Sequence, residues 1–379
     1  MKKLIKNGCK NYKSNVKGMG SFVMIFYNSV NIETEGYYGI SHLIEHCMCN
    51  QLKNYELDFE KYGINYNAST NLTYVDFYLT GLDEGVIKFR DLFYDLVVNY
   101  QIPEEVFERE RKIVIQEFND ILGRPRSVFN ENILRKFFNI RSPLGEKKDL
   151  QNLTYDKFIE YKNKHFSKPT FICNTSSSKI KKDEFETQRI QLNLIDLTGS
   201  DSIGLPMHKP FVSDTSRNIC YLSKFTYDQK TLEEHLYYSL IAKYLCYGLS
   251  SPLYKDLREK TGHIYSVSAA AETLLEEGNA SFSIFVSTEP KYEEEIKEKL
   301  LECLNTHLNS VDRKIFDSVI IGWKNSLKKA NLLSFSKNNT FNSYYIDVCK
   351  KFEFDFEKFK EYSKKLLKNN YFLFNDVTY

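Results

Sequence analysis

The order of expected strands and helices repeats once along the chain, and this repetition limits the possible folds more than any other feature. The first half is expected to contain a strand within 17–30, a helix at 40–52, a strand at 65–79, and helices at 86–98 and 103–121. The second half is expected to contain a strand at 219–225, helices at 232–247 and 252–260, strands at 264–271 and 280–287, and helices at 292–308 and 312–332. The least patterned stretch, 174–201, lies between these two sets. The sequence therefore predicts two related halves, as an internal duplication would produce.

Composition excludes several classes of protein. The 379 residues include 52 Lys and Arg against 50 Asp and Glu, so the net charge is only +2. This balance argues against a nucleic-acid binder or a protein of anionic membranes. Every apolar run is shorter than the roughly 18 to 20 residues that span a bilayer, so no membrane segment is expected. The 8 Cys are too sparse for a disulfide scaffold, and without a recognisable targeting peptide they favour a reducing cytoplasm.

The sharpest motif is the pentapeptide His-Leu-Ile-Glu-His at 42–46, inside the helix expected at 40–52. Residues four apart lie on one helix face, so His42 and His46 can share a metal ion with Glu45 beside them. This order of residues is the inverted form of the zinc-peptidase pattern. The alternative interpretation is a helix with two surface histidines and a solvated glutamate.

A catalytic zinc ion needs a third protein ligand in addition to two histidines. The helix expected at 103–121 offers Glu110 and Glu117, which are seven residues apart and therefore lie on the same side of that helix. A helix so rich in charge is more often a solvated face. Spacing alone does not decide whether this helix supplies a zinc ligand or is a solvated charged face.

These residues resemble the pitrilysin and insulysin family of inverted-motif zinc metallopeptidases, which includes the mitochondrial processing peptidases. Residues 39–46 resemble the active-site helix of that family, and residues 67–70 with 77–79 resemble its active-site edge strand. Residues 142–145 and 152–154 resemble the segment that follows the zinc-ligand helix. In the second half, residues 257–265 resemble the motif in which an Arg and a Tyr seven residues later reach the substrate.

The resemblance implies a fold and a domain division. The expected fold class is α+β, with two homologous α/β-sandwich halves, each a mixed, largely antiparallel sheet with helices packed on it. A linker would join a catalytic zinc-binding half, residues 1–190, to a second half, residues 191–379, that carries the Arg/Tyr pair. The two halves would form half of a peptide-enclosing chamber.

The resemblance also implies a metal centre with one Zn²⁺ per chain. His42, His46 and Glu117 would be the ligands, and Glu110 would position a ligand histidine. Glu45 would act as the general base on a water that the metal activates, and would pass the proton to the departing amine.

Substrate binding is expected to involve both halves. The strand that carries Asn67 and Ala68 would pair with an extended peptide. Arg258 would bind a backbone carbonyl of the substrate, and Tyr265 would help to stabilise the oxyanion.

These expectations describe a zinc-dependent endopeptidase of the cytoplasm that cleaves peptides or unfolded leader segments. The first alternative is a non-catalytic relative that binds peptides or scaffolds a complex beside an active partner chain. The second alternative is an unrelated two-domain α/β protein with a chance motif. Because one chain carries both the zinc set and the Arg/Tyr pair, a homodimer is favoured over a heterodimer with a related chain, and neither nucleic acid nor a membrane is expected as a partner.

Overall fold

The computed structural model of the chain divides into two compact units, and each is described by itself. The described residues are 2–5, 8–14, 16–177, 186–187, 190–193, 205–210, 213–228, 231–273, 279–328 and 351–377. The first unit comprises the described residues of 1–121 and 134–205. The second comprises those of 122–133, 206–329 and 345–379.

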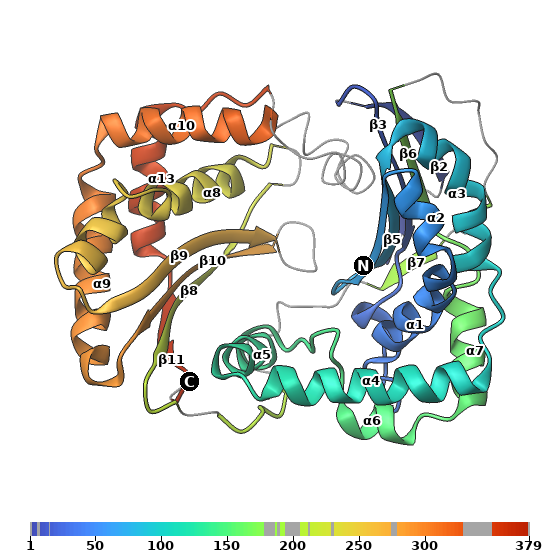
Figure 1. The fold of residues 1–379 in the computed structure, drawn as a ribbon. Helices are drawn as coiled ribbons and strands as arrows, with labels where there is room; N and C mark the ends of the chain where they lie inside the picture. The colour runs from blue at the N-terminus through green and yellow to red at the C-terminus, as the bar shows by residue number, and fades with distance from the viewer. Residues whose placement is uncertain are drawn as a thin grey trace. The chain divides into compact units, whose positions relative to one another are not determined.

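The first unit is built on a five-stranded sheet (Figure 1). Its strands, in spatial order, are β2 (Gly8–Lys13), β6 (Phe171–Ser176), β3 (Met19–Phe26), β5 (Val75–Leu82) and β4 (Ile64–Thr70). Only β2 and β6 pair in parallel, and the other neighbours are antiparallel. Two further strands, β1 (Lys2–Ile5) and β7 (Ile190–Asn193), form a separate antiparallel pair. The strand β4 is therefore an edge of the main sheet.

Helices cover one face of this sheet. They are α1 (Ile40–Cys49), α2 (Glu56–Lys61), α3 (Asp83–Val98), α4 (Glu104–Leu122), α6 (Lys147–Asn152) and α7 (Tyr155–His165). The helix α5 (Pro125–Phe138) is divided between the units, because its residues up to 133 belong to the second unit and the others to the first. Successive side chains of a strand point to opposite faces. Phe22, Met24 and Phe26 of β3 accordingly join the core formed with the helices, whereas Val23 and Ile25 pack in a smaller cluster on the other face.

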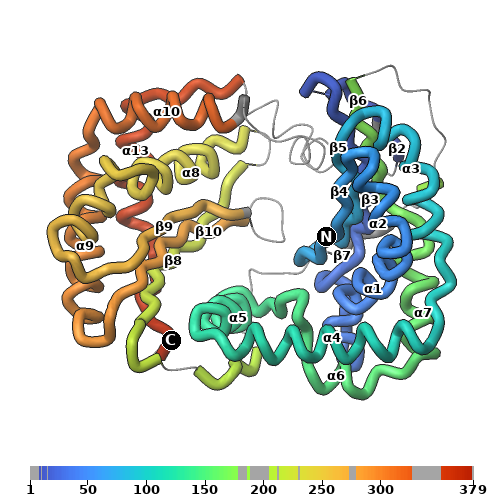
Figure 2. Tube along the Cα trace, viewed as in Figure 1, coloured from blue at the N-terminus to red at the C-terminus, as the bar shows by residue number. Residues whose placement is uncertain are grey.

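The second unit contains a four-stranded, wholly antiparallel sheet. Its strands, in spatial order, are β11 (Tyr371–Asn375), β8 (Arg217–Thr226), β10 (Asn279–Thr288) and β9 (Ile264–Thr273). Its helices are α8 (Glu233–Cys246), α9 (Glu293–Asn309), α10 (Arg313–Lys328) and α13 (Phe356–Lys368). Figure 2 shows β11, near the end of the chain, beside β8 in this sheet. A buried aromatic and aliphatic core joins the helices to the strands.

The expected fold class is confirmed, since each unit is a mixed or antiparallel sheet with helices packed on it. The prediction of a single strand at 65–79 is wrong. The chain forms two strands there, β4 and β5, because Asn71 donates its N–H to the carbonyl of Tyr74 at 2.8 Å and closes a hairpin turn. The short helix expected at 252–260 is one π-helical segment, Tyr254–Glu259.

The expected division at residue 190 remains a prediction, because most of the stretch 174–201 lies outside the described residues. Residues 122–133, which open α5, belong to the second unit, although they lie far ahead of that division in the sequence. Among the described helices, none combines the length and apolar character needed to cross a bilayer.

Candidate metal centre

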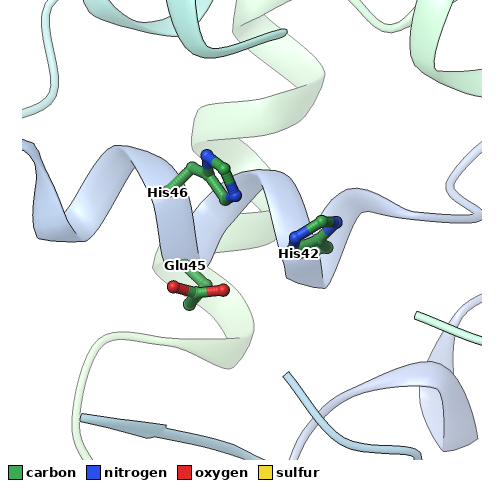
Figure 3. A group of neighbouring side chains, drawn as sticks. All are labelled: His42, Glu45 and His46. Atoms are coloured by element: carbon green, nitrogen blue, oxygen red, sulfur yellow. The ribbon is translucent and has the colours of Figure 1, made fainter. Parts of the chain in front are cut away.

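The helix α1 has two faces of different character. Its apolar side chains, Ile40, Leu43, Ile44, Cys47 and Met48, are all buried in the core of the first unit. His42, Glu45 and His46 leave this face and are only partly buried. Figure 3 shows these three side chains projecting from the same stretch of helix. The apolar face therefore anchors the helix while the other face presents polar groups.

The polar side chains of α1 converge with a carboxylate from a second helix. Ligand atoms of His42, Glu45 and His46 all lie within 4.8 Å of one another. The Oε2 atom of Glu117, on α4, lies 3.7 Å from Nε2 of His42 and 3.5 Å from Nε2 of His46. The structure thus brings together all four residues that the sequence assigned to zinc and its general base.

The charge states of these groups suit metal binding. Burial, together with the neighbouring His46, lowers the pKa of His42 to about 3, so its imidazole is neutral near pH 7. A neutral imidazole is the form that binds zinc. Burial also raises the pKa of Glu45, an effect opposed by His46 and by a hydrogen bond from Thr70. A carboxyl group whose pKa is raised takes up a proton more readily than an exposed one.

The donor set fits a zinc ion. It consists of two imidazoles and one carboxylate, which is a ligand combination found in catalytic zinc sites. The Nε2 atoms of both imidazoles lie 3.5 to 3.7 Å from the Oε2 atom of Glu117, so three potential donor atoms are gathered at one place. The side chain of Glu117 is 41% exposed, which leaves the centre open to water.

Glu110 lies behind the candidate ligands. It is only 2% exposed, and its Oε2 atom lies 3.6 Å from Nδ1 of His46. Its Oε1 atom accepts hydrogen bonds from Nδ2 of Asn50 at 3.1 Å and from the guanidinium of Arg109 at 3.2 and 3.3 Å. This position allows Glu110 to orient the ring of His46. Sequence reasoning did not identify Asn50 or Arg109, because neither belongs to a recognisable motif.

The edge strand β4 ends at the metal centre. Thr70, its last residue, donates from Oγ1 to Oε2 of Glu45 at 3.3 Å. Asn67 and Ala68 lie earlier in the same strand, where Asn67 Oδ1 accepts the N–H of Ala68 at 2.8 Å. The expected edge strand is present, but the contact with Glu45 comes from Thr70, for which sequence reasoning had assigned no role.

Arg258 and Tyr265 both belong to the second unit. Arg258 lies in the π-helical segment, with its guanidinium carbon 5.2 Å from the centre of the Tyr254 ring. Tyr265 lies near the start of β9 and is 62% exposed. Both side chains are thus on neighbouring elements of one unit, and their approach to a substrate stays a prediction.

The entry to α1 is held by a close backbone contact. Gly145 has a left-handed backbone, φ 67°, and a Cβ atom placed on it would lie 2.2 Å from the backbone nitrogen of Gly39. Next to it, the N–H of Glu146 donates to the carbonyl of Tyr38 at 3.2 Å. Only glycine satisfies both the backbone angle and this separation. The segment after α5 therefore fixes the place where the metal-binding helix begins.

We expect Gly145→Ala to lower the free energy of unfolding by about 3 kcal/mol, through the left-handed backbone and the overlap with Gly39. Gly18→Ala is the matched control, because Gly18 has φ 74° and nothing within 4 Å of the added Cβ. We expect Gly18→Ala to lower the free energy of unfolding by only about 1 kcal/mol, because it strains the left-handed backbone without any steric overlap. Urea unfolding followed by circular dichroism measures both, and equal losses would contradict the steric argument.

Two histidines and a glutamate in the order His-x-x-Glu-His on one helix, with a carboxylate from a second helix beside both rings, define the inverted zinc-peptidase arrangement. Comparison with known families agrees with this class. Residues 30–146 match the insulinase family, peptidase family M16, and residues 152–322 match the peptidase M16 inactive domain. The chain belongs to peptidase family M16, which confirms the resemblance inferred from the motifs.

Individual relatives are distant. An uncharacterised zinc protease of Rickettsia felis is 24% identical over 309 residues, which cover 78% of this chain and 73% of that protein. The beta subunit of the mitochondrial-processing peptidase of Neurospora crassa is 23% identical over 138 residues, or 34% of this chain and 29% of that protein. The structure of a putative M16-like peptidase from Alicyclobacillus acidocaldarius has a TM-score of 0.71 at 13% identity and covers 99% of this chain and 97% of that chain. The last similarity supports the fold alone.

Proposed function

We propose that the chain is a zinc-dependent endopeptidase that cleaves peptides or unfolded leader segments. The observation that carries this proposal is the convergence of His42, His46 and Glu117, with Glu45 beside them. A chance motif on a surface helix would not place a carboxylate from another helix 3.5 to 3.7 Å from both imidazoles.

In this proposal His42, His46 and Glu117 hold one zinc ion per chain. When bound, zinc would lower the pKa of a water and polarise the carbonyl of the substrate. Glu45 takes the proton from the attacking water and passes it to the amine that leaves. Glu110 holds His46 in the orientation for binding, because Asn50 and Arg109 fix its other oxygen atom.

The substrate in this proposal is an extended peptide. Among the described strands, β4 pairs on one side only, and peptides bind to such edges by main-chain hydrogen bonds with modest demands on sequence. Asn67 and Ala68 lie in this strand, which leads to Glu45 through Thr70. Arg258 orients the substrate carbonyl and Tyr265 stabilises the oxyanion, the roles implied by the Arg/Tyr motif of the second unit.

A second chain and a reducing compartment complete the proposal. The N. crassa relative is named as a subunit, which supports a working assembly of two chains, a homodimer first and a heterodimer second. A cytoplasmic location is supported by free thiols at Cys9, Cys47, Cys49, Cys173, Cys220, Cys246 and Cys303, the cysteines within the described residues. A chain that sediments as a monomer and cleaves peptides alone would remove the need for a partner.

The decisive experiment is to incubate the purified chain with a mixture of unstructured peptides and to identify products by mass spectrometry. We expect internal cleavage, together with about one zinc per chain by elemental analysis. Bound zinc without cleavage of any peptide, alone or with a candidate partner chain, would favour the alternative function. That alternative is a non-catalytic relative that binds peptides or scaffolds a complex.

We expect Thr70→Val to lower kcat about fivefold, because one hydrogen bond of about 1 kcal/mol no longer orients the carboxylate of Glu45. Thr80→Val is the control. Thr80 lies on β5, and strand alternation places it on the face of the sheet opposite to Phe77 and Leu79, which pack against the helices. Steady-state peptide hydrolysis measures both variants. An unchanged kcat for Thr70→Val would show that Glu45 needs no such support.

A further inference from the structure

The helix α1 begins without a cap of its own. Its N-cap residue is Gly39, which has φ 96° and no side chain to accept a hydrogen bond, and its first turn contains no acidic residue. The first N–H groups of an α-helix have no partner within the helix. His42 lies in this first turn of α1. The group that accepts hydrogen bonds from these N–H groups therefore affects the position of His42.

Glu33 supplies the missing acceptor. Its Oε2 atom accepts the N–H of Gly39 at 2.9 Å, and its Oε1 atom accepts the N–H of Ser41, also at 2.9 Å. Glu33 follows a short 3-10 segment, Val30–Ile32, and is only 9% exposed. Both oxygen atoms of this buried carboxylate therefore accept hydrogen bonds from the start of α1.

The first turn of α1 stabilises the charged form of this carboxylate. Burial raises the pKa of Glu33, and the hydrogen bonds from the N–H groups of Gly39 and Ser41 oppose that rise. The N-terminus of a helix favours negative charge because its N–H groups and its dipole both point outward there. The contact of Glu33 with these N–H groups is thus of a kind that only the first turn of a helix offers.

We propose that Glu33 is a positioning residue of the metal centre, which holds the first turn of α1 and so fixes where His42 presents its imidazole. Ser41, one of the two residues that it binds, directly precedes His42. Glu45 and His46 lie one turn further on, where helix hydrogen bonds hold them. The proposal rests on the proposed function, because zinc is the ion that His42 would bind. The contact of Glu33 with the first turn of α1 does not depend on zinc.

A second carboxylate offers a matched control. Asp149 Oδ2 also accepts two backbone N–H groups, from Gly36 at 2.8 Å and from Tyr38 at 3.2 Å. These groups precede α1, so Asp149 holds the incoming loop rather than the helix. If Glu33 acts through the first turn of α1, only its replacement weakens metal binding.

The test compares Glu33→Gln with Asp149→Ala by zinc affinity, measured in competition with a chromophoric chelator. Gln keeps the size of Glu but replaces one acceptor oxygen by an NH2 group that cannot accept, and Ala at 149 removes the one oxygen atom that accepts both loop N–H groups. We expect Glu33→Gln to bind zinc about tenfold more weakly and to alter the visible absorption of the cobalt-substituted protein, with Asp149→Ala near wild type. We also expect faster hydrogen exchange at Gly39 and Ser41, and a lower kcat with little change in KM.

The outcomes separate this proposal from the function on which it rests. Zinc affinity and a cobalt spectrum equal to wild type for Glu33→Gln would overturn it, and so would equal losses in both variants. If Glu33→Gln does not fold by circular dichroism, Glu33→Asp, which retains both oxygen atoms, is expected to give an intermediate zinc affinity, and wild-type affinity would overturn the proposal. If the wild-type chain binds no zinc, the peptidase function fails, whereas unchanged exchange at Gly39 and Ser41 in Glu33→Gln would still refute the helix contact.

Discussion

Glu45→Gln is expected to lower kcat for peptide cleavage about 100- to 10,000-fold while zinc content stays at the wild-type level. Gln has the shape of Glu, and its amide oxygen can still accept the hydrogen bond from Thr70. It cannot take a proton from water near pH 7, so the variant removes general-base chemistry and leaves the donor set of His42, His46 and Glu117 in place. Stopped assays with long incubation, together with elemental analysis, measure both quantities.

The control for this variant is Glu60→Gln, an exposed side chain on α2. It makes the same chemical change away from the metal centre and is expected to leave kcat unaltered. A Glu45→Gln variant that still cleaved peptides at the wild-type rate would refute the role of Glu45. A variant that lost its zinc would show instead that Glu45 is needed to assemble the site.

Removal of the metal is expected to abolish peptide cleavage, and re-addition of zinc is expected to restore it. The three candidate ligands are nitrogen and oxygen donors in a set that suits zinc, so a strong chelator competes for the ion directly. Magnesium is expected to give no recovery, since it prefers an octahedral set of oxygen ligands. Activity that survives prolonged chelation would exclude the zinc mechanism.

The matched variant for the chelation experiment is His42→Ala. Loss of one ligand leaves His46 and Glu117, which is fewer than the three protein ligands of a catalytic zinc site. We therefore expect no recovery of activity at zinc concentrations that restore the wild-type chain. Recovery equal to wild type would mean that His42 is not a ligand and that another group completes the set.

The metal centre could be predicted from the sequence where its residues follow a local rule. His42, Glu45 and His46 are within one helix turn, so spacing alone places them on one face. Glu117 lies next to them in the structure, but its assignment as a ligand needs the family resemblance, because no local pattern relates two helices that pack together only in the folded unit. The distances from Glu117 to both imidazoles supply that missing relation.

The supporting residues were missed for a physical reason. Thr70 and Asn50 act through single hydrogen bonds across the fold, and Glu33 acts through two hydrogen bonds to the backbone of Gly39 and Ser41. Such contacts leave no periodic trace in a sequence. The strand expected at 65–79 shows the same limit, since its β-rich composition concealed the turn between β4 and β5. Long elements with regular apolar spacing, such as α3 and α4, were located to within a few residues.

The candidate ligands are divided between α1 and α4, and this division has a consequence for biosynthesis. The two histidines emerge from the ribosome together, whereas Glu117 follows after the β4–β5 hairpin and α3. Bringing Glu117 next to the histidines closes a long loop and costs chain entropy. Only the packing of the folded unit offsets that cost. A nascent chain thus holds two ligands on a marginal helix and acquires the third when the unit folds. In the proposed peptidase, hydrolytic competence would then arise at the end of folding, which spares the unfinished chain and its neighbours from premature cleavage.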